Sequence, residues 1–264
     1  MRIIFIGDIV GKIGRKAVYD VLPVLKNKYA ADLVIANGEN ATHGKGLSKK
    51  HYEYLLSLGI DVITLGNHYD TQKEMEQYID SAPKLVRPYN LAIAFPGAGT
   101  KVFNVNGTPV RVTNIIGNAF INMELKPAYE SINEIVNNSK EQIHIIDFHG
   151  ETTGEKQAIS YAFDGKVSAI LGTHTHVQTN DEKILPGGTG FIADVGMCGA
   201  ELGVLGFEKN SVINKTLLGS AQKFKLDETG DYIFNAVFLE INNKDGKTKK
   251  IEKIRIETHG KNAN

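Results

Sequence analysis

The 264-residue sequence contains a single cysteine, no tryptophan and no excess of charge of either sign. One cysteine cannot form an internal disulfide and excludes a site built from several thiolates, and it suits a reducing compartment. Lysine plus arginine and aspartate plus glutamate each number 30, so the formal net charge is zero. No global basic field therefore attracts nucleic acid or a membrane surface, and an anionic partner must be bound locally.

Long hydrophobic runs are also missing. Nowhere do about 18 consecutive apolar residues occur, and residues 1–8 lack the basic and long apolar regions of a signal peptide. We therefore expect a soluble, cytoplasmic protein with no membrane partner. The composition is globular, with 42% hydrophobic and 23% charged residues, and no linker, fixed-period repeat or low-complexity run divides the chain. We expect a single domain over residues 1–264.

Short apolar runs alternate with helix-like segments along much of the chain. Five runs have the length of a strand and are apolar throughout, as expected when both faces are buried: 3–6, 33–36, 62–65, 143–146 and 167–171. Ser48 can cap a helix that runs to about Leu58, and Thr152 with Glu155 predicts a capping box for a helix through Tyr161. This alternation indicates an α/β sheet whose site lies at the strand ends.

Two other segments predict antiparallel strands. Residues 101–115 alternate in polarity and are interrupted by Asn106-Gly107, and residues 232–256 contain two strand-like runs joined around 243–246. A sandwich with mixed sheets accommodates both kinds of strand better than a simple doubly wound sheet. The lysine cluster at 244–253 is interleaved with Asp245 and Glu252, which favours a solvated hairpin tip over a nucleic-acid site.

Polar groups follow each of the five buried runs. In chain order they are Asp8, Glu39 and Asn40, Asn67 and His68, Asp147 and His149, and His174 and His176. Because the carboxyl ends of strands in an open α/β sheet lie at one edge, we expect these side chains to converge. If strand geometry continues through them, His174 and His176 project to the same face. Each signal alone is also typical of a turn, so the prediction depends on the whole set.

The donor types restrict the metal that such a cluster can hold. Carboxylate, carboxamide and imidazole without thiolate suit manganese, iron, zinc, magnesium or cobalt, and the number of imidazoles argues against a pure magnesium or calcium site. This set of candidate ligands is too large for one catalytic ion that keeps an open position. Two ions about 3.5 to 4 Å apart that share one carboxylate would use them, an arrangement common in phosphoester chemistry.

In their order and spacing these residues resemble the five blocks of the calcineurin-like metallophosphoesterases, and more narrowly the bacterial YmdB-like subfamily. The likeness covers essentially the full chain, including residues 7–11, 37–40, 147–149, 174–179 and 194–197. It implies an αββα sandwich with mixed β-sheets and helices on the outer faces. The subfamily commonly has Gly-Asn-His-Thr-Trp-Asp where residues 66–70 are Gly-Asn-His-Tyr-Asp, one residue shorter and without the tryptophan. This difference concerns the rim of the site and its substrate preference.

The resemblance also implies roles for individual residues. It implies two ion sites that share a carboxylate, held by Asp8, Glu39, Asn40 and His176 and by Glu39, Asn67, His149 and His174. Iron or manganese is expected, with zinc, magnesium or cobalt as alternatives. His68 is implied as the general acid, which fits an imidazole that follows a ligand in the chain. Asp147 and Asp194 are equally well interpreted as groups that orient ligand imidazoles or as ordinary turn residues.

The implied activity is that of a dinuclear metal-dependent phosphodiesterase of the 2′,3′-cyclic-nucleotide 2′-phosphodiesterase type. In it a metal-bound hydroxide attacks phosphorus and His68 protonates the leaving ribose oxygen. A phosphomonoesterase or nuclease on the same centre and a metal- or nucleotide-binding regulatory protein with little turnover remain alternatives. The expected partner is a small cyclic nucleotide. RNA stays open but is unsupported by the net charge, and a homo-oligomer stays open. His43 and Lys45 could contact a phosphate or a base, although a solvated loop is the simpler interpretation.

Overall fold

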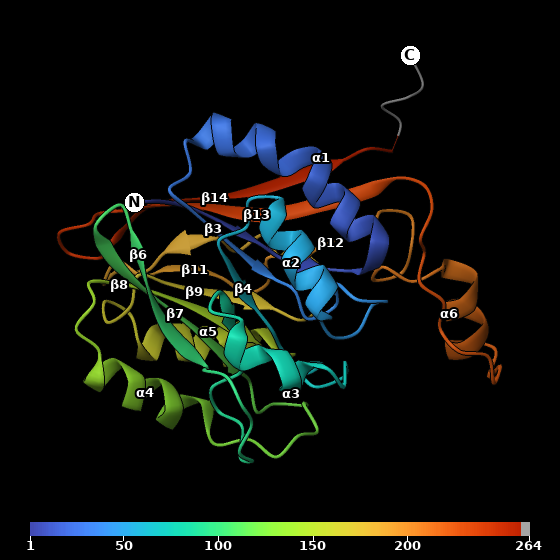
Figure 1. Ribbon diagram of the computed structural model, residues 1–264, viewed down its shortest axis with the longest axis horizontal. Helices are drawn as coiled ribbons and strands as arrows, with labels where there is room; N and C mark the ends of the chain where they lie inside the picture. The colour runs from blue at the N-terminus through green and yellow to red at the C-terminus, as the bar shows by residue number, and fades with distance from the viewer. Residues whose placement is uncertain (260–264) are drawn as a thin grey trace.

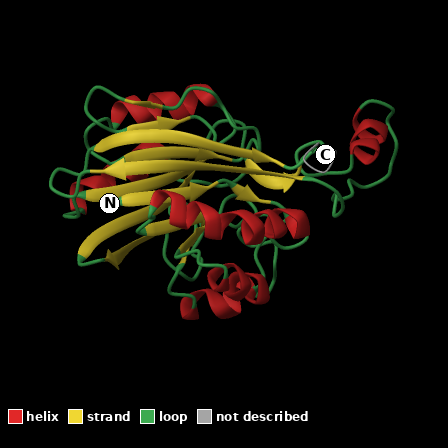
Figure 2. Ribbon diagram, turned by 90° about the horizontal axis from the view of Figure 1, so that it is seen from above, coloured by secondary structure: helices red, strands yellow, loops and turns green. Residues whose placement is uncertain are grey.

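Two mixed β-sheets lie face to face in the computed structural model, which describes residues 1–259 (Figures 1 and 2). The first sheet has the order β2 (Asp8–Ile9), β12 (Met197–Ala200), β13 (Tyr232–Ile241), β1 (Arg2–Ile6), β3 (Leu33–Asn37), β4 (Val62–Thr64) and β5 (Leu85–Val86), and β14 (Thr248–Glu257) pairs with β13. The second has the order β10 (Lys183–Ile184), β11 (Gly190–Ile192), β9 (Ala169–Thr173), β8 (Ile143–His149), β7 (Thr108–Ile116) and β6 (Thr100–Val105).

Both sheets combine parallel and antiparallel neighbours. In the first, β1, β3, β4 and β5 are parallel, whereas β13 is antiparallel to β1, β12 and β14. In the second, β7, β8, β9 and β11 are parallel and β6 and β10 are antiparallel edge strands. The turn between β6 and β7 is at Asn106 and Gly107, whose φ angles of 50° and 83° suit a two-residue hairpin. The predicted sandwich of mixed sheets is confirmed.

Continuous apolarity in the strands reflects burial on both faces. Along β1, Ile3 and Phe5 face the core between the two sheets, whereas Ile4 and Ile6 face the helices that cover the outside of the first sheet. These helices are α1 (Gly11–Tyr29) and α2 (Lys49–Ser57). On the outer face of the second sheet, Ile146 packs in a core with residues of α4 (Ala128–Asn138) and α5 (Thr153–Ala162). Helices therefore cover both outer faces, as the αββα class requires.

The helix ends show one correct and one partly wrong prediction. Ser48 caps α2 by accepting a hydrogen bond from the backbone N–H of His51, as predicted. Thr152 caps α5 through the N–H of Glu155, but the Glu155 carboxylate does not complete a capping box. It accepts instead from the N–H groups of Asn118 and Ala119, at 2.8 and 3.2 Å. The loop after β7 brings these donors close, so tertiary contact replaces the local one.

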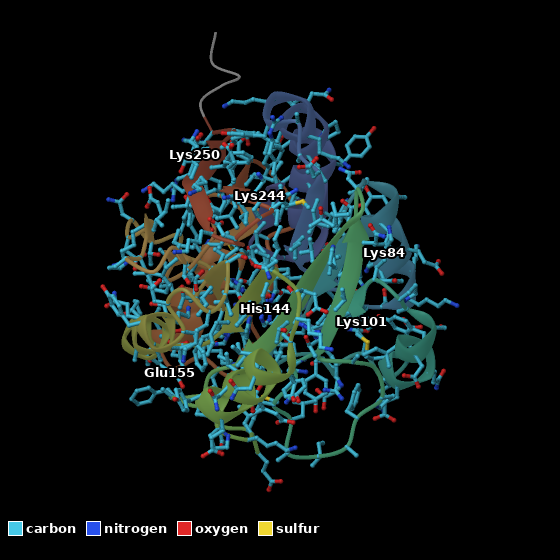
Figure 3. The ribbon with its side chains drawn as sticks, turned by 90° about the vertical axis from the view of Figure 1, so that its left-hand side faces the viewer. Lys84, Lys101, His144, Glu155, Lys244 and Lys250 are labelled. Atoms are coloured by element: carbon cyan, nitrogen blue, oxygen red, sulfur yellow. The ribbon has the colours of Figure 1, made fainter. Side chains whose placement is uncertain are left out.

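The remaining helices are short: α3 (Met75–Tyr78), a 3₁₀ turn at Ile79–Ser81, and α6 (Lys209–Thr216). The segment that carries α6 projects from the sandwich, on the right of Figure 1. The β13–β14 hairpin turns at the opposite end, where Lys244 is exposed (Figure 3), in agreement with a solvated tip. Within residues 1–259, no helix has the length and apolar character needed to cross a membrane.

Candidate metal centre

The polar residues predicted to converge do so at one edge of the sandwich. β1, β3 and β4 are parallel neighbours in one sheet, and β8 and β9 are parallel neighbours in the other. Their carboxyl ends therefore lie at the same edge. The candidate ligands lie at these strand ends and in the segments that follow, with His149 the last residue of β8 and Asp8 the first of β2. A hydrogen bond from the Nδ2 of Asn37 at the end of β3 to Oδ2 of Asp147 on β8, at 3.0 Å, joins the two sheets at this edge.

Glu39 lies at the middle of the cluster. Its side chain is almost completely buried. Oε1 lies 3.2 Å from Nε2 of His149, 3.3 Å from Nδ1 of His68 and 3.1 Å from Nδ2 of Asn40. Oε2 accepts a hydrogen bond from the backbone N–H of His68 at 3.1 Å. One carboxylate thus contacts side chains from three of the predicted loops, including both parts of the cluster described below.

One part of the cluster joins Asn40 to His176. Nδ2 of Asn40 lies 3.1 Å from Nε2 of His176. The other ring nitrogen of His176, Nδ1, lies 3.0 Å from the carbonyl oxygen of Leu205, in the segment that leads to α6. A carbonyl can only accept, so Nδ1 carries the proton and Nε2 presents its lone pair towards Asn40. This is the tautomer that a metal ion bound through Nε2 requires.

The other part of the cluster surrounds His149. Nε2 of His149 lies 2.9 Å from Oδ1 of Asn67 and 3.0 Å from Nδ1 of His174. Donor atoms of Glu39, His149 and His174 all lie within 4.8 Å of one another, as a shared cation would require. One ring nitrogen cannot satisfy a carboxylate oxygen, a carboxamide oxygen and a second imidazole at once. The geometry is that of donors converging on a common point.

The Asp8 side chain is completely buried, and only one of its two carboxylate oxygens has a hydrogen-bond donor in residues 1–259. Its Oδ2 accepts from the backbone N–H of His174 at 3.1 Å, whereas Oδ1 has no hydrogen-bond partner within the described residues. The nearest basic atom to Oδ1 is Nδ1 of His149, at 3.9 Å. Burial raises the pKa of the Asp8 carboxyl well above its ordinary value, against the effect of His149. A buried acceptor without a donor costs free energy, which a bound cation would offset.

The imidazoles differ in protonation. Burial lowers the pKa of His174 to about 3 and also lowers that of His176, so both are neutral and able to ligate. Burial opposes the charged form of His149 too, but Glu39, Asp8 and Asp147 outweigh it and raise its pKa to about 9. Burial likewise opposes the charged form of Glu39, yet His149 holds its pKa well below the ordinary value. A cation bound here would displace the proton between Glu39 and His149.

The residues present fit divalent metal ions of intermediate hardness. Oxygen and nitrogen donors converge, the imidazoles are neutral or held by a proton that a cation can replace, and Asp8 offers an unused oxygen. Cys198 contributes nothing to this set. Its thiol is buried, donates to the carbonyl of Asn235 and has a pKa raised by that burial, so it is inert packing.

The loop after β9 departs from the predicted strand geometry. β9 ends at Thr173, and His174 and His176 have φ angles of 109° and 67°. These are sparsely populated, left-handed conformations for residues other than glycine. Strand geometry therefore does not continue through His174 and His176, which was the condition for both imidazoles to project to the same face. They reach one cluster because the chain turns sharply, and such strain is typical of functional loops.

A family model described as YmdB-like protein matches residues 4–254. The chain belongs to the YmdB-like family. It is 42% identical to the 2′,3′-cyclic-nucleotide 2′-phosphodiesterase of Bacillus subtilis over 257 residues, which cover 97% of each chain. A solved phosphatase of Mycoplasma pneumoniae is 41% identical, with a TM-score of 0.93 over 97% of this chain and 93% of the other.

A calcineurin-like phosphoesterase of Bacillus subtilis shares the fold, with a TM-score of 0.52 at 13% identity, over 99% of this chain and 91% of the other. Family membership and the relatives place this YmdB-like protein among the phosphoric diester hydrolases, with a fold of the calcineurin-like metallophosphoesterases. The resemblance seen in the sequence is thereby confirmed, and the fold implies divalent metal ions.

Two groups that support the cluster escaped sequence analysis. Thr173, the last residue of β9, lies 2.9 Å from Nδ1 of His149 through its hydroxyl, which donates to Asp147 at 2.6 Å. The hydrogen-bond link from Asp147 to the imidazole therefore runs through Thr173. Glu151 lies 3.0 Å from Nε2 of His174. The position of Glu151, two residues after the candidate ligand His149, is the sequence feature that could have indicated its place at the cluster.

The Asp194 carboxylate accepts hydrogen bonds from Lys156 and from backbone N–H groups, and none from the imidazole of His149, His174 or His176. Its Oδ2 accepts from the buried ammonium of Lys156 at 2.9 Å and from the N–H of Thr175 at 3.0 Å, and Oδ1 accepts from the N–H of Gly196 at 2.8 Å. Lys156 also donates to the carbonyl of Thr173 at 3.0 Å. This buried ion pair holds the ends of the loop that presents His174 and His176.

The rim beside His68 has its own packing in this YmdB-like protein. Tyr69 follows His68 directly. It is buried, and its ring lies edge-on against Phe95, with centroids 4.8 Å apart. An aromatic side chain therefore still supports this rim, but from within the core. His43 and Lys45 are exposed on the neighbouring loop.

Proposed function

We propose that this centre holds two metal ions and hydrolyses 2′,3′-cyclic nucleotides to nucleoside monophosphates. The observation that supports this proposal best is that Glu39 contacts both parts of the donor cluster, with Asn40 on one side and His149 on the other. A shared carboxylate is the usual bridge of a two-ion phosphoesterase site. The name of the 42% identical relative from Bacillus subtilis supports the choice of substrate.

The ligand sets proposed from the sequence follow this division. Asp8, Asn40 and His176 with Glu39 would hold one ion, and Asn67, His149 and His174 with Glu39 the other. Bound ions would polarise the phosphate and lower the pKa of a coordinated water. Two divalent ions against the carboxylates of Asp8 and Glu39 leave a formal charge of about +2, which attracts a phosphodiester to a chain without net charge. Iron or manganese suits this donor set best.

We assign His68 the role of proton donor. Nδ1 lies 3.1 Å from Oδ1 of Asn40 and 3.3 Å from Oε1 of Glu39, so the ring is held at the edge of the cluster. Its side chain is 27% exposed, in contrast to the almost fully buried Glu39. Nε2 is the ring atom left for a substrate oxygen. We assign it the proton that the departing ribose oxygen takes when the cyclic ester opens.

The test combines metal analysis with a substrate panel. Protein purified without chelator and reconstituted with manganese or iron is assayed on 2′,3′-cyclic AMP, bis-para-nitrophenyl phosphate, the corresponding monoester and a short RNA. We expect two ions per chain and the highest kcat/KM on 2′,3′-cyclic AMP. A preference for the monoester or for internal cleavage of RNA would replace this function by a phosphomonoesterase or nuclease. Bound metal without turnover of any ester would indicate a regulatory protein.

Ion stoichiometry tests the bridging role separately. Glu39→Gln should lose both ions, because the carboxylate contacts both groups of donors, whereas His176→Ala should lose one. Glu53→Gln is the matched control, since Glu53 is an exposed carboxylate on α2. Retention of two ions by Glu39→Gln would remove the basis of the shared site.

A further inference from the structure

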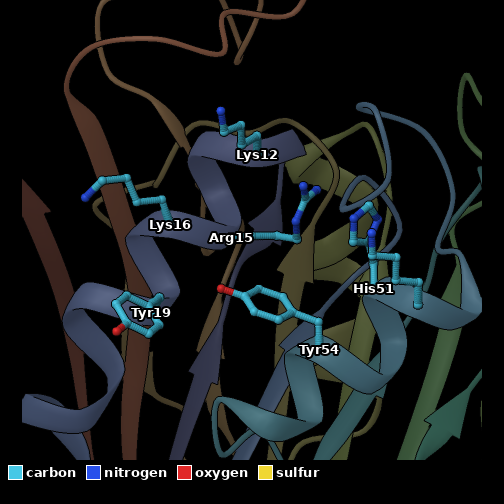
Figure 4. A pocket seen from close by; sticks show the side chains of 7 residues that line it. Lys12, Arg15, Lys16, Tyr19, His51 and Tyr54 are labelled. Atoms are coloured by element: carbon cyan, nitrogen blue, oxygen red, sulfur yellow. The ribbon is translucent and has the colours of Figure 1, made fainter.

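A groove of about 460 Å³ lies between α1 and α2, outside the candidate metal centre. Side chains from the two helices face each other across it (Figure 4). Its lining combines cations with aromatic rings and contains no carboxylate: Lys12, Arg15, Lys16, Tyr19, Lys50, His51 and Tyr54. In a chain with no net charge, this is a local concentration of positive charge.

The positive charge of the groove is largely uncompensated. Lys12 and Lys50 are exposed, and neither forms an ion pair within residues 1–259. Lys16 alone pairs with a carboxylate, that of Asp20. The first turns of α1 and α2 contain no acidic residue, although helix starts favour negative charge. Cations crowded at two helix starts are unfavourable by themselves, and a bound polyanion would relieve the repulsion.

Exposed aromatic rings distinguish this groove from a site for a simple anion. Tyr19 and Tyr54 are 59% and 39% exposed. Burial, followed by the charge of Arg15, lowers the pKa of His51 to about 4, so its ring is neutral. Cations that track a backbone, interleaved with rings on which bases stack, are the physical requirements for binding a single nucleic-acid strand. An acidic peptide offers no bases to stack, so it fits this lining less well.

The groove adjoins the metal centre through short contacts. The N–H of Gly11, next to Lys12, donates to the carbonyl of Asn40 at 3.0 Å. The guanidinium of Arg15 donates to the carbonyl of Ala41, and Nδ1 of His51 lies 2.8 Å from the hydroxyl of Thr42. The groove therefore begins within a few residues of a candidate ligand. A chain lying in it could present one end to the centre.

Positive charge continues on the other side of the same loop. A second hollow, of about 560 Å³, is lined by Lys45, Lys215, Lys223 and Lys225 together with His43 and two phenylalanines, Phe207 and Phe224. His51 lines the groove and His43 lines the second hollow. Their ring centroids lie 6.3 Å apart, so the two hollows are close neighbours. Only Glu228 brings a negative charge to this lining. Basic side chains thus line hollows on both sides of the segment that carries His43 and His51.

We propose that the α1–α2 groove binds the backbone and bases of a single-stranded oligoribonucleotide whose 3′ end lies at the metal centre. The inference deepens the proposed function and rests on it for chemistry, since the substrate becomes an RNA end that carries a 2′,3′-cyclic phosphate. Binding in the groove does not require turnover. The two hollows together are lined by eight lysine and arginine side chains. Carboxylates elsewhere in the chain balance this charge, so the net charge of zero gave no indication of RNA binding.

Binding is measured by fluorescence anisotropy on the protein as purified, with a labelled oligoribonucleotide of about ten nucleotides that ends in a 3′-hydroxyl and so carries no cyclic phosphate to hydrolyse. We expect affinity to fall steeply with salt and to drop by about tenfold or more in Lys12→Ala/Lys50→Ala. Both lysines are exposed, so this variant should fold. The matched control is Lys244→Ala/Lys249→Ala, on the β13–β14 hairpin, with Lys244 labelled in Figure 3. Tyr54→Ala should weaken binding without changing the salt slope.

Turnover separates the groove from the centre. In Lys12→Ala/Lys50→Ala we expect unchanged kcat and KM on 2′,3′-cyclic AMP but a raised KM on an oligoribonucleotide that ends in a 2′,3′-cyclic phosphate. No binding by the wild type at low salt, equal loss in the control variant, or equal competition by polyglutamate would overturn the groove assignment. If groove-dependent binding is found but the wild type hydrolyses no cyclic ester, the proposed function fails and the groove stands.

Discussion

The hydroxyl of Thr173 lies 2.9 Å from Nδ1 of His149 and donates a hydrogen bond to Asp147 at 2.6 Å. Asp147 also accepts from Asn37 and Thr64. Thr173 has one hydroxyl proton, which it donates to Asp147, so the Thr173 oxygen accepts from Nδ1–H of His149. Nε2 is left to face Glu39 and Asn67, which is the orientation that a metal ligand needs.

Removal of the Thr173 hydroxyl should weaken metal binding. Thr173→Val keeps the shape of the side chain but leaves Nδ1 of His149 and one oxygen of Asp147 without a partner. We expect the metal affinity to fall by about 10- to 100-fold. The measurement is metal content after dialysis against graded chelator. Thr173→Ser, which keeps the hydroxyl, should stay near wild type, and a Thr173→Val protein with wild-type affinity would contradict the assigned relay.

His68→Ala should separate proton donation from metal binding. Because His68 lies beside Glu39 and Asn40 and is not among the proposed ligands, metal content should stay near wild type. Turnover should fall by about a hundredfold to ten-thousandfold. Parallel metal analysis and kcat measurements decide the matter, with exposed His259→Ala as control. Loss of metal would make His68 a ligand, and unchanged kcat would exclude it as the acid.

Gly66 leaves space that the centre needs. A Cβ at this position would overlap Oε2 of Glu39 and Nε2 of His149, two of the proposed ligand atoms. Gly66→Ala should therefore lose metal and activity. Gly154→Ala is the control, because a Cβ there meets nothing within 4 Å and the residue lies in helix α5. That variant should keep its metal and gain about 0.4 to 1 kcal/mol in unfolding free energy. Full metal content in Gly66→Ala would contradict the packing argument.

His144 should make stability depend on pH. This imidazole is buried within β8, lies 2.8 Å from the hydroxyl of Thr113, and is labelled in Figure 3. Burial, followed by the charge of Arg111, lowers its pKa from 6.5 to about 3. The fold therefore holds it neutral, whereas the unfolded chain protonates it below 6.5. Its contribution is fully present above that pH and is lost as the pH falls towards 3.

The comparison for His144 is with His144→Gln, which retains a neutral donor and acceptor. Between about pH 7.5 and about pH 5 the wild type should lose about 2 kcal/mol more unfolding free energy than the variant. Urea unfolding at both values measures this. All other titrating groups are shared by the two chains, so equal losses would show that His144 is not the responsible group.

Local sequence was sufficient for the central strands and for most of the side chains of the site. Runs apolar on both faces identified β1, β3, β4, β8 and β9, and the polar residue after each run named the side chains that now lie together. Asn106-Gly107 predicted the β6–β7 turn because few other pairs adopt positive φ at both positions. Such features depend on neighbours in the chain, so they can be read without the fold.

Tertiary structure alone decided the features that depend on contacts between distant segments. The Glu155 carboxylate binds the loop after β7, the turn at His174 and His176 is left-handed, and the Leu205 carbonyl selects the tautomer of His176. The basic groove likewise exists only because α1 and α2 lie side by side. The sequence determined which chemical groups the protein has. Packing determined which of them meet, because hydrogen bonds and charge act over a few ångströms in space and not along the chain.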